Sequence, residues 1–151
     1  MKALTIFIAI TLSHSFLMAE QIAPKLEKAL TEEIRKALSL TEHRQEKNIS
    51  LIRRGLISNQ TTDRARCAQY LAKFGSIKDV PYLIDALSDE SHHVGANYLV
   101  AGMATTRYWA NVALISICKT SYDYRWDASK EDRAYSISLW VQHWNRIKPE
   151  E

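Results

Sequence analysis

The stretch that most constrains the fold is residues 63–89, which has the pattern of two short helices joined at a glycine. Apolar side chains recur on one helical face in each half, at Cys67, Ala68, Leu71 and Phe74 and then at Val80, Leu83, Ile84 and Leu87. This spacing is typical of amphipathic helices. Between the halves we expect Gly75 to be a left-handed C′ residue and Ser76 with Asp79 to form a capping box. The stretch therefore predicts a helical hairpin.

The same pattern recurs on both sides of this hairpin. The second-helix residues Ile49, Ile52 and Leu56 precede Val80, Leu83 and Leu87 by 31 positions. Later in the chain, Ile137, Trp140, Val141 and Trp144 repeat the spacing of Val80, Leu83, Ile84 and Leu87. The first-helix residues Arg64, Cys67, Leu71 and Phe74 recur as Arg107, Ala110, Leu114 and Ile117. A pair this short cannot bury both apolar stripes alone, and roughly three stacked pairs are needed for a core. We predict an all-α fold, a short α-solenoid of about three helix pairs.

An insertion interrupts the period in the second half of the chain. After Asp89 the next first-helix arginine, Arg107, comes later than the period predicts, and residues 90–106 have no helical pattern. Long loops in compact domains often carry function. Two interpretations stay open, a functional loop with an extended segment at residues 98–100, or a plain lid over the edge of the repeats.

Residues 64–89 resemble the HEAT-like repeat of phycobilisome-lyase type. The resemblance rests on Arg64, Cys67-Ala68, Leu71, Phe74-Gly75, Val80-Pro81, Leu83-Ile84, Ala86-Leu87 and Asp89. It implies an α-solenoid, an armadillo-type fold that binds partners on the helix surfaces it exposes. The stretch from Thr105 to Asp127 also resembles the closing unit of exported HEAT-like proteins, with Lys119 and Asp123 standing where that unit implies glycines.

The beginning of the chain has the pattern of a signal peptide. Lys2 precedes an apolar run over residues 3–12, and a more polar segment closes on Ala19. The run is shorter than the ~20 residues that a membrane-spanning helix needs. We therefore expect a signal peptide at 1–19 and a HEAT-like domain at 20–151, exported to the periplasm or secreted, with no membrane span after cleavage. An uncleaved N-terminal anchor is the alternative.

Charge and cysteine placement restrict the partners and the redox chemistry. The net charge is +3 and charges of both signs are interspersed, so we do not expect nucleic acid as a partner. Cys67 and Cys118 occupy different levels of adjacent predicted helices, about 12 Å apart along the axes. A disulfide requires Cα atoms within ~7 Å. We predict two free, buried thiols.

Signals for catalysis and metal binding are sparse. The histidines have no metal-ligand spacing, and no nucleophile, phosphate-loop or dinucleotide motif occurs. The carboxylates Asp123, Asp127, Glu131 and Asp132 lie near Tyr122, Tyr124 and Trp126, a combination that could hold a sugar or a cation. Capping of the last helix by Asp127 or Ser129, with acids in its first turn, explains the same residues, and we favour it. We expect no enzyme, cofactor or metal.

The repeat arithmetic also predicts a binding surface. Leu51, Tyr82 and Leu139 are equivalent positions outside the apolar stripes, and Arg54, Asp85 and Gln142 form the next rung. Both rungs should face outward, although Arg54 and Asp85 could instead simply pair with each other. His92, His93 and Tyr98 are candidates in the inserted loop. We predict a monomeric scaffold or adaptor that binds a protein partner; the alternatives are an inhibitor or immunity-type protein that blocks a toxic enzyme, and, less favoured, a lyase-like enzyme.

Overall fold

The computed structural model describes residues 24–25, 27–38, 46–91 and 105–150. Residues 24–25 and 27–38 are helical and are called helix 27–38 below. The elements that follow are α2 (Glu46–Gly55), α3 (Thr61–Phe74), the 3-10 turn η1 (Ile77–Asp79), α4 (Val80–Ala86), α5 (Thr106–Cys118) and α6 (Lys130–Ile147). No strand occurs in these ranges, so the predicted all-α class is confirmed for the part of the chain that the structure describes.

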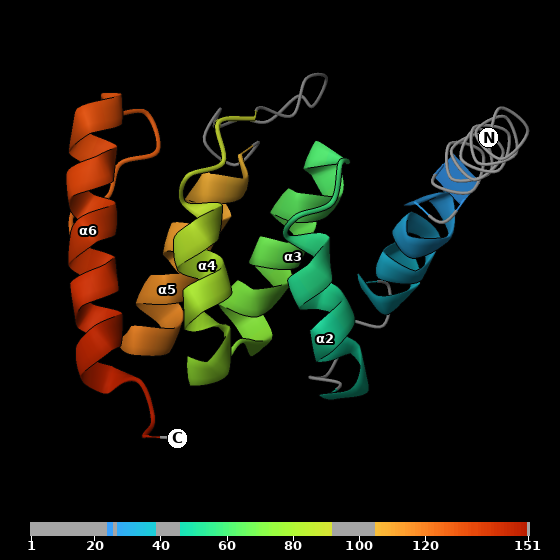
Figure 1. Cartoon of the computed structure of the whole chain (residues 1–151), viewed down its shortest axis with the longest axis horizontal. Helices are drawn as coiled ribbons and strands as arrows, with labels where there is room; N and C mark the ends of the chain where they lie inside the picture. The colour runs from blue at the N-terminus through green and yellow to red at the C-terminus, as the bar shows by residue number, and fades with distance from the viewer. Residues whose placement is uncertain (1–23, 26, 39–45, 92–104, 151) are drawn as a thin grey trace, which may run out of the picture.

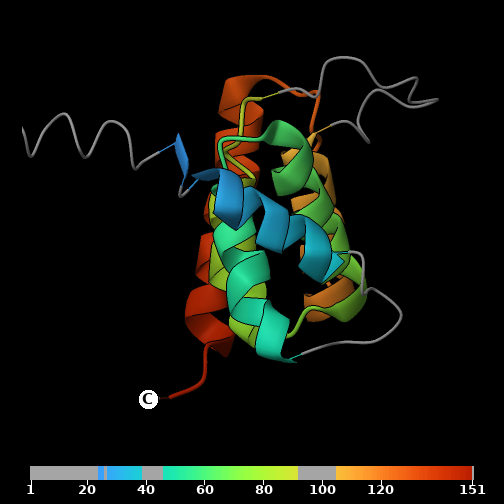
Figure 2. The same cartoon turned by 90° about the vertical axis from the view of Figure 1, so that its right-hand side faces the viewer.

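The helices follow one another in chain order across the molecule, from helix 27–38 at one end to α6 at the other (Figure 1). In the view turned by 90°, α2, α4 and α6 lie in one layer, α3 and α5 lie in a second, and helix 27–38 crosses the near end (Figure 2). α3 packs on α2 and α5, and α4 packs on α5 and α6. In the two later predicted pairs, α3 with α4 and α5 with α6, the first and second helices thus lie in different layers.

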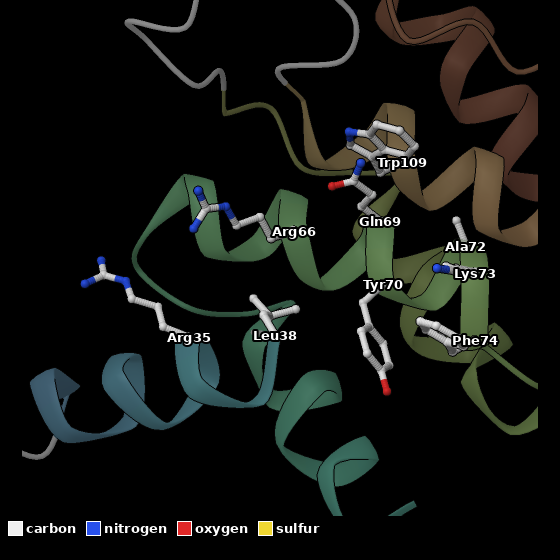
Figure 3. Close-up of a pocket in the computed structure, with 9 residues that line it drawn as sticks. All are labelled: Arg35, Leu38, Arg66, Gln69, Tyr70, Ala72, Lys73, Phe74 and Trp109. Carbon is white, nitrogen blue, oxygen red and sulfur yellow. The ribbon is translucent and has the colours of Figure 1, made fainter. Parts of the chain in front are cut away.

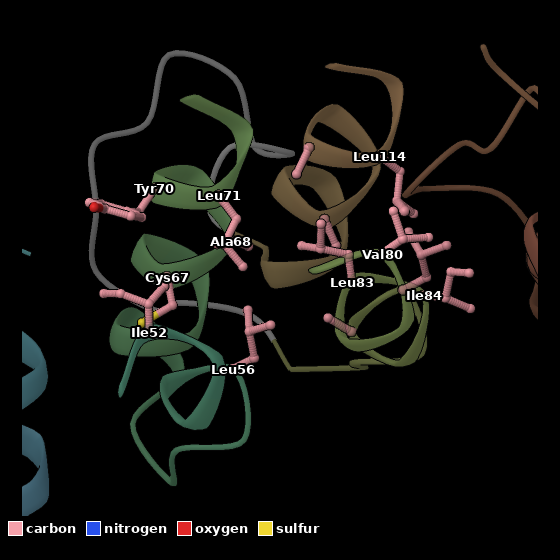
Figure 4. Packing of buried hydrophobic residues seen from close by; sticks show 14 of the residues in the cluster. Ile52, Leu56, Cys67, Ala68, Tyr70, Leu71, Val80, Leu83, Ile84 and Leu114 are labelled. Atoms are coloured by element: carbon pink, nitrogen blue, oxygen red, sulfur yellow. The ribbon is translucent and has the colours of Figure 1, made fainter. Parts of the chain in front are cut away.

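The core follows the predicted apolar stripes. Ile49, Ile52 and Leu56 are buried, as are their counterparts 31 positions later, Val80, Leu83 and Leu87. Ile52 lies beside Cys67 between α2 and α3, while Val80 and Leu83 point toward α5, which contributes Leu114 (Figure 4). Residues 31 positions apart in sequence are therefore also buried at equivalent places in the core.

The turn inside the hairpin agrees with one prediction and corrects another. Ser76 and Asp79 form the predicted capping box, with the Ser76 amide donating to Asp79 Oδ2 over 2.7 Å. Gly75 is extended, with φ −67° and ψ 163°, so the predicted left-handed conformation is wrong. Position 75 requires a glycine because of close packing. A Cβ there would overlap the Leu71 carbonyl oxygen and lie 2.7 Å from Ile117 Cδ1. The helix then restarts through η1, which places Pro81 in the first turn of α4.

The buried face of α6 differs from the predicted one. Trp140 is fully buried and Ile137 and Trp144 are partly buried, but Val141 is 41% exposed. Arg133 and Ser136 are buried instead. The face is therefore centred on residues 133, 136 and 140, and this rotation of the helix about its axis moves Val141 toward solvent.

The α5–α6 connection contains the two left-handed non-glycine residues of the described chain. Both Lys119 and Asp123 have φ of 55°. These are the positions at which the resemblance implied glycines. Tyr124, which directly follows Asp123, is buried and donates its hydroxyl to the Leu87 carbonyl over 2.7 Å. Burial raises the pKa of Tyr124 to about 12, and the bond ties this connection to the end of α4.

Candidate functional site

The predicted surface ladder is partly assembled in the structure. Tyr82 and Asp85 lie exposed on α4, and Arg54 is exposed on α2. Leu51 is half-buried and packs against the core, so it does not face outward as predicted. Among the described ion pairs none joins Arg54 to Asp85. The predicted alternative, an ion pair between Arg54 and Asp85, is thus absent from the described residues.

Tyr82 and Asp85 line a groove of about 400 Å³, here called the α2–α4 groove. Ile57, which follows α2, lines it too and is 83% exposed, while Tyr82 is 45% exposed. Arg53 stands 5.3 Å from the centre of the Tyr82 ring and donates from Nε to Asp79 Oδ1 over 2.7 Å. This partly buried ion pair fixes the guanidinium, which lies against the Tyr82 ring.

The remaining predicted residues lie apart from this groove. Gln142 is exposed on α6, and the half-buried Leu139 lines a separate cavity of about 910 Å³ with Tyr122 and Tyr135. The structure therefore does not bring all six helix residues into one site. His92, His93 and Tyr98 lie outside the described residues, as does the extended segment predicted at residues 98–100.

The polar residues before α6 form a helix cap at Ser129 and an ion pair at Asp127. Ser129 is the N-cap of α6 and accepts from the Asp132 amide, while its hydroxyl donates to Asp132 Oδ2 over 2.8 Å. Asp127 pairs with Arg125 at 3.3 Å. No group of metal-ligating side chains is found within the described ranges. The prediction of helix capping at Ser129 is confirmed.

Two adjacent acids after α4 connect three helices. Arg64 of α3 donates from Nε to Asp89 Oδ2 over 2.7 Å. Glu90 accepts hydrogen bonds from Arg107 of α5 over 2.9 Å and from Arg133 of α6 over 2.6 Å. Burial alone would raise the pKa of Asp89, but hydrogen bonds from Arg64 and Ser91 outweigh it and hold the pKa below its usual value. These contacts fix Arg64 and Arg107, which are equivalent in the repeat, and occupy their guanidinium groups with carboxylates of the chain itself.

Both cysteines are free, which confirms the prediction of two unpaired thiols. Cys67 is fully buried, and burial, with a smaller effect of the Asp63 carboxylate, raises its pKa to about 12. Cys118 is half-buried, not fully buried as predicted, and its partial burial still raises its pKa. Neither environment produces the thiolate that nucleophilic catalysis requires.

A second cleft, which sequence reasoning missed, opens on the opposite layer. It has a volume of about 750 Å³ and is lined by side chains of helix 27–38, α3 and α5 (Figure 3). We call it the basic-aromatic cleft, because its lining combines cations with aromatic rings. The lining residues are Arg35, Leu38, Arg66, Gln69, Tyr70, Ala72, Lys73, Phe74 and Trp109.

The repeat spacing contained the signal for this cleft. Arg35 precedes Arg66 by 31 positions, and Leu38 precedes Gln69 by the same interval. Trp109 follows Arg66 by 43 positions, as Arg107 follows Arg64. The cleft is thus a ladder on the first helices, and the arithmetic that identified Tyr82 on the second helices would have found it.

Comparison with protein-family models, with curated proteins and with solved structures finds no match to this chain. The resemblance to HEAT-like repeats therefore rests on the residues quoted for it. None of the described helices is both long and apolar enough to cross a membrane.

Proposed function

We propose that the chain is an exported, non-enzymatic helical-repeat module, a short α-solenoid, that binds a protein partner in the α2–α4 groove. One observation carries this proposal. Ile57 and Tyr82 are two large apolar side chains exposed to solvent, and both line the same groove. Neighbouring exposed apolar groups with a polar rim mark interaction sites, and tyrosine is a frequent anchor residue in interfaces.

The rim supplies polar complementarity to this apolar centre. Asp85, Asn59 and Ser88 line the groove beside the two apolar residues. Because the Arg53–Asp79 pair holds Arg53 against the Tyr82 ring, the ring is ordered before a partner arrives. Preordering lowers the entropy lost on binding, which favours affinity. The two-layer arrangement and the 31-residue period of burial support the solenoid architecture.

Affinity capture from cell-envelope extracts, followed by mass spectrometry, tests the proposal. Tyr82→Ala should weaken capture of the specific partner at least about tenfold, which corresponds to ~1.4 kcal/mol. Its melting temperature should change little, because the lost contact with Arg53 contributes only ~0.5–1 kcal/mol at an exposed site. Tyr135→Ala is the matched control, since Tyr135 is an exposed tyrosine on α6.

The proposal fails if Tyr82→Ala and Ile57→Ser both capture the same proteins as the wild type with unchanged yield. If the captured partner is a toxic enzyme and its activity falls on binding, the module acts as an inhibitor or immunity-type protein. Turnover of a bilin or carbohydrate panel by the purified chain would contradict the non-enzymatic part of the proposal.

A further inference from the structure

We infer that the basic-aromatic cleft is a second docking site, which takes an acidic amphipathic helix of a partner protein. This inference rests on the proposed role as a protein-binding module and adds the chemistry of a ligand. The charged residues that line the cleft, Arg35, Arg66 and Lys73, are all cations. The apolar part of the lining is formed by Leu38, Ala72 and the rings of Tyr70, Phe74 and Trp109.

The charge of the cleft is only partly neutralised by the chain itself. Arg35 has two acids nearby, with Asp63 at 3.7 Å and Glu32 at 4.0 Å. Lys73 stands 4.9 Å from the centre of the Phe74 ring, a contact that leaves its charge in place. Arg66 is exposed and makes no ion pair with the residues that the structure describes. Two cations on α3 are therefore available to carboxylates.

The spacing of these cations favours a helix as the ligand. Arg66, Gln69 and Lys73 are the exposed positions of one face of α3. Arg66 and Lys73 are seven residues apart, which is two turns or ~10.5 Å along the axis. A ligand helix with carboxylates two turns apart matches this interval, and its apolar side chains meet the aromatic floor. This is the helix-in-groove mode of recognition.

Nucleic acid fits the cleft less well than an acidic helix. Backbone tracking needs many cations along a path, because duplex DNA carries one charge per ~1.7 Å. The cleft offers three, one of them shared with Asp63 and Glu32. Its apolar lining also requires a ligand with apolar side chains next to its charges, which a helical peptide provides.

The test uses the full exported chain and a synthetic, tryptophan-free helical peptide. The peptide has glutamates two turns apart on one face and leucines beside them, and a matched peptide has glutamine at the glutamate positions. Fluorescence anisotropy should show at least about tenfold weaker binding of the glutamine peptide, or ~1.4 kcal/mol. Binding of the glutamate peptide should fall as salt is raised.

Charge reversal on the protein tests the location. The Arg66→Glu/Lys73→Glu variant should weaken binding of the glutamate peptide at least about tenfold, and the milder Arg66→Gln/Lys73→Gln should weaken it less. Lys78→Glu/Lys148→Glu is the matched control, because both lysines are exposed and lie outside the cleft and the charge change is the same. Melting by circular dichroism verifies that each variant folds.

Tryptophan emission provides a local readout. Peptide binding should change the emission, and the change should be lost in Trp109→Phe but kept in Trp126→Phe, because only Trp109 lines the cleft. Three results would each overturn the inference. The two peptides could bind equally, the control variant could lose as much binding as the charge-reversal variant, or oligothymidylate could bind as tightly as the peptide at the same salt. Tyr82→Ala should leave peptide binding unchanged, so failure here is separable from failure of the α2–α4 groove.

Discussion

Arg53 of α2 donates from Nε to the fully buried carboxylate of Asp79 over 2.7 Å, and this bond joins one predicted repeat to the next. The same carboxylate also accepts from the amide and hydroxyl of Ser76 at the start of the following helix. Asp79 therefore performs two tasks with its two oxygens, capping within its own pair and bridging to the pair before. A buried charge of this kind is tolerated because every oxygen has a donor.

Asp79→Ala should destabilise the fold strongly, because it leaves the Arg53 guanidinium without its counter-ion and removes the capping box. Loss of one partner of a buried pair costs ~3–5 kcal/mol. Asp79→Asn should cost less, since the amide oxygen can still accept one bond. Urea denaturation measures both losses. Asp127→Asn, at the exposed pair with Arg125, is the control and should cost ~0–1 kcal/mol; equal losses at the two sites would contradict the bridging role.

Lys119→Gly should stabilise the protein, because Lys119 holds a left-handed conformation with φ 55° and ψ 30°. That conformation costs a non-glycine residue ~1–2 kcal/mol, against ~0.5–1 kcal/mol for the extra freedom of glycine in the unfolded chain. The expected net gain is ~0.5–1 kcal/mol, seen by thermal melting as an increase of a few degrees at most. Lys148→Gly is the control, because Lys148 has φ −58° and should gain nothing.

The local pattern of residues 63–89 predicted two helices, the capping box between them and the burial of Leu71 and Leu83, because each depends on side chains a few residues apart in sequence. The repeat arithmetic placed Tyr82 at the surface, where the structure has it. It did not find the basic-aromatic cleft, because an exposed polar face on α3 looks like an ordinary solvated face unless its positions are compared between repeats. Arg35 and Arg66 are equivalent by the 31-residue period, but only the position of helix 27–38 beside α3 shows that they line one cleft.

Other features depend on tertiary geometry and have no sequence signal of their own. Arg133 reaches Glu90 from 43 positions away, and no local pattern indicates that contact. The sequence indicates that Gly75 is a special position, but it does not distinguish a glycine needed for positive φ from one needed for close packing. The Leu71 carbonyl oxygen, with Ile117 of α5 close behind it, makes Gly75 the second kind. Tertiary packing also decides which face of α6 is buried: Arg133 and Ser136 are buried, and Val141 is left exposed.

Stability should fall at acid pH in part through Asp89. Its pKa is held below the usual value in the folded protein, so the unfolded chain binds a proton more readily. The stabilisation is fully present above the unfolded pKa of ~3.9 and is lost as the pH falls through the folded pKa. Urea midpoints measured from neutral pH downward should show a shallower acid slope in Asp89→Asn. An unchanged slope in that variant would refute the contribution of the Arg64–Asp89 bond.

The two thiols should react at different rates with a disulfide reagent in the folded protein. Cys118 is half-buried, whereas Cys67 is fully buried and has its pKa raised to about 12. We expect Cys118 to react first and Cys67 to react only as fast as the chain opens. Single-cysteine variants with alanine at the other position assign the two phases. Comparable rates in the native state would mean that the packing around Cys67 is loose.

Gly55 at the end of α2 lies directly against Cys67 of α3. A Cβ at residue 55 would overlap the Cys67 sulfur and lie 3.4 Å from Ile34 Cγ2 of helix 27–38. Gly55→Ala should therefore force these three helical segments apart and destabilise the protein by ~1–3 kcal/mol, the usual cost of overpacking a core. The free energy of unfolding in urea measures this loss.

A double-mutant cycle separates steric overlap from any other effect of the new methyl group. Cys67→Ala removes the sulfur that a Cβ at residue 55 would meet, and by itself it should cost a modest amount by opening a small cavity. In the Cys67→Ala background, Gly55→Ala should cost less than in the wild type, because the methyl group enters the space that the sulfur leaves. The expected coupling is ~0.5–3 kcal/mol. Additive losses would show that α2 and α3 do not meet through this pair of residues.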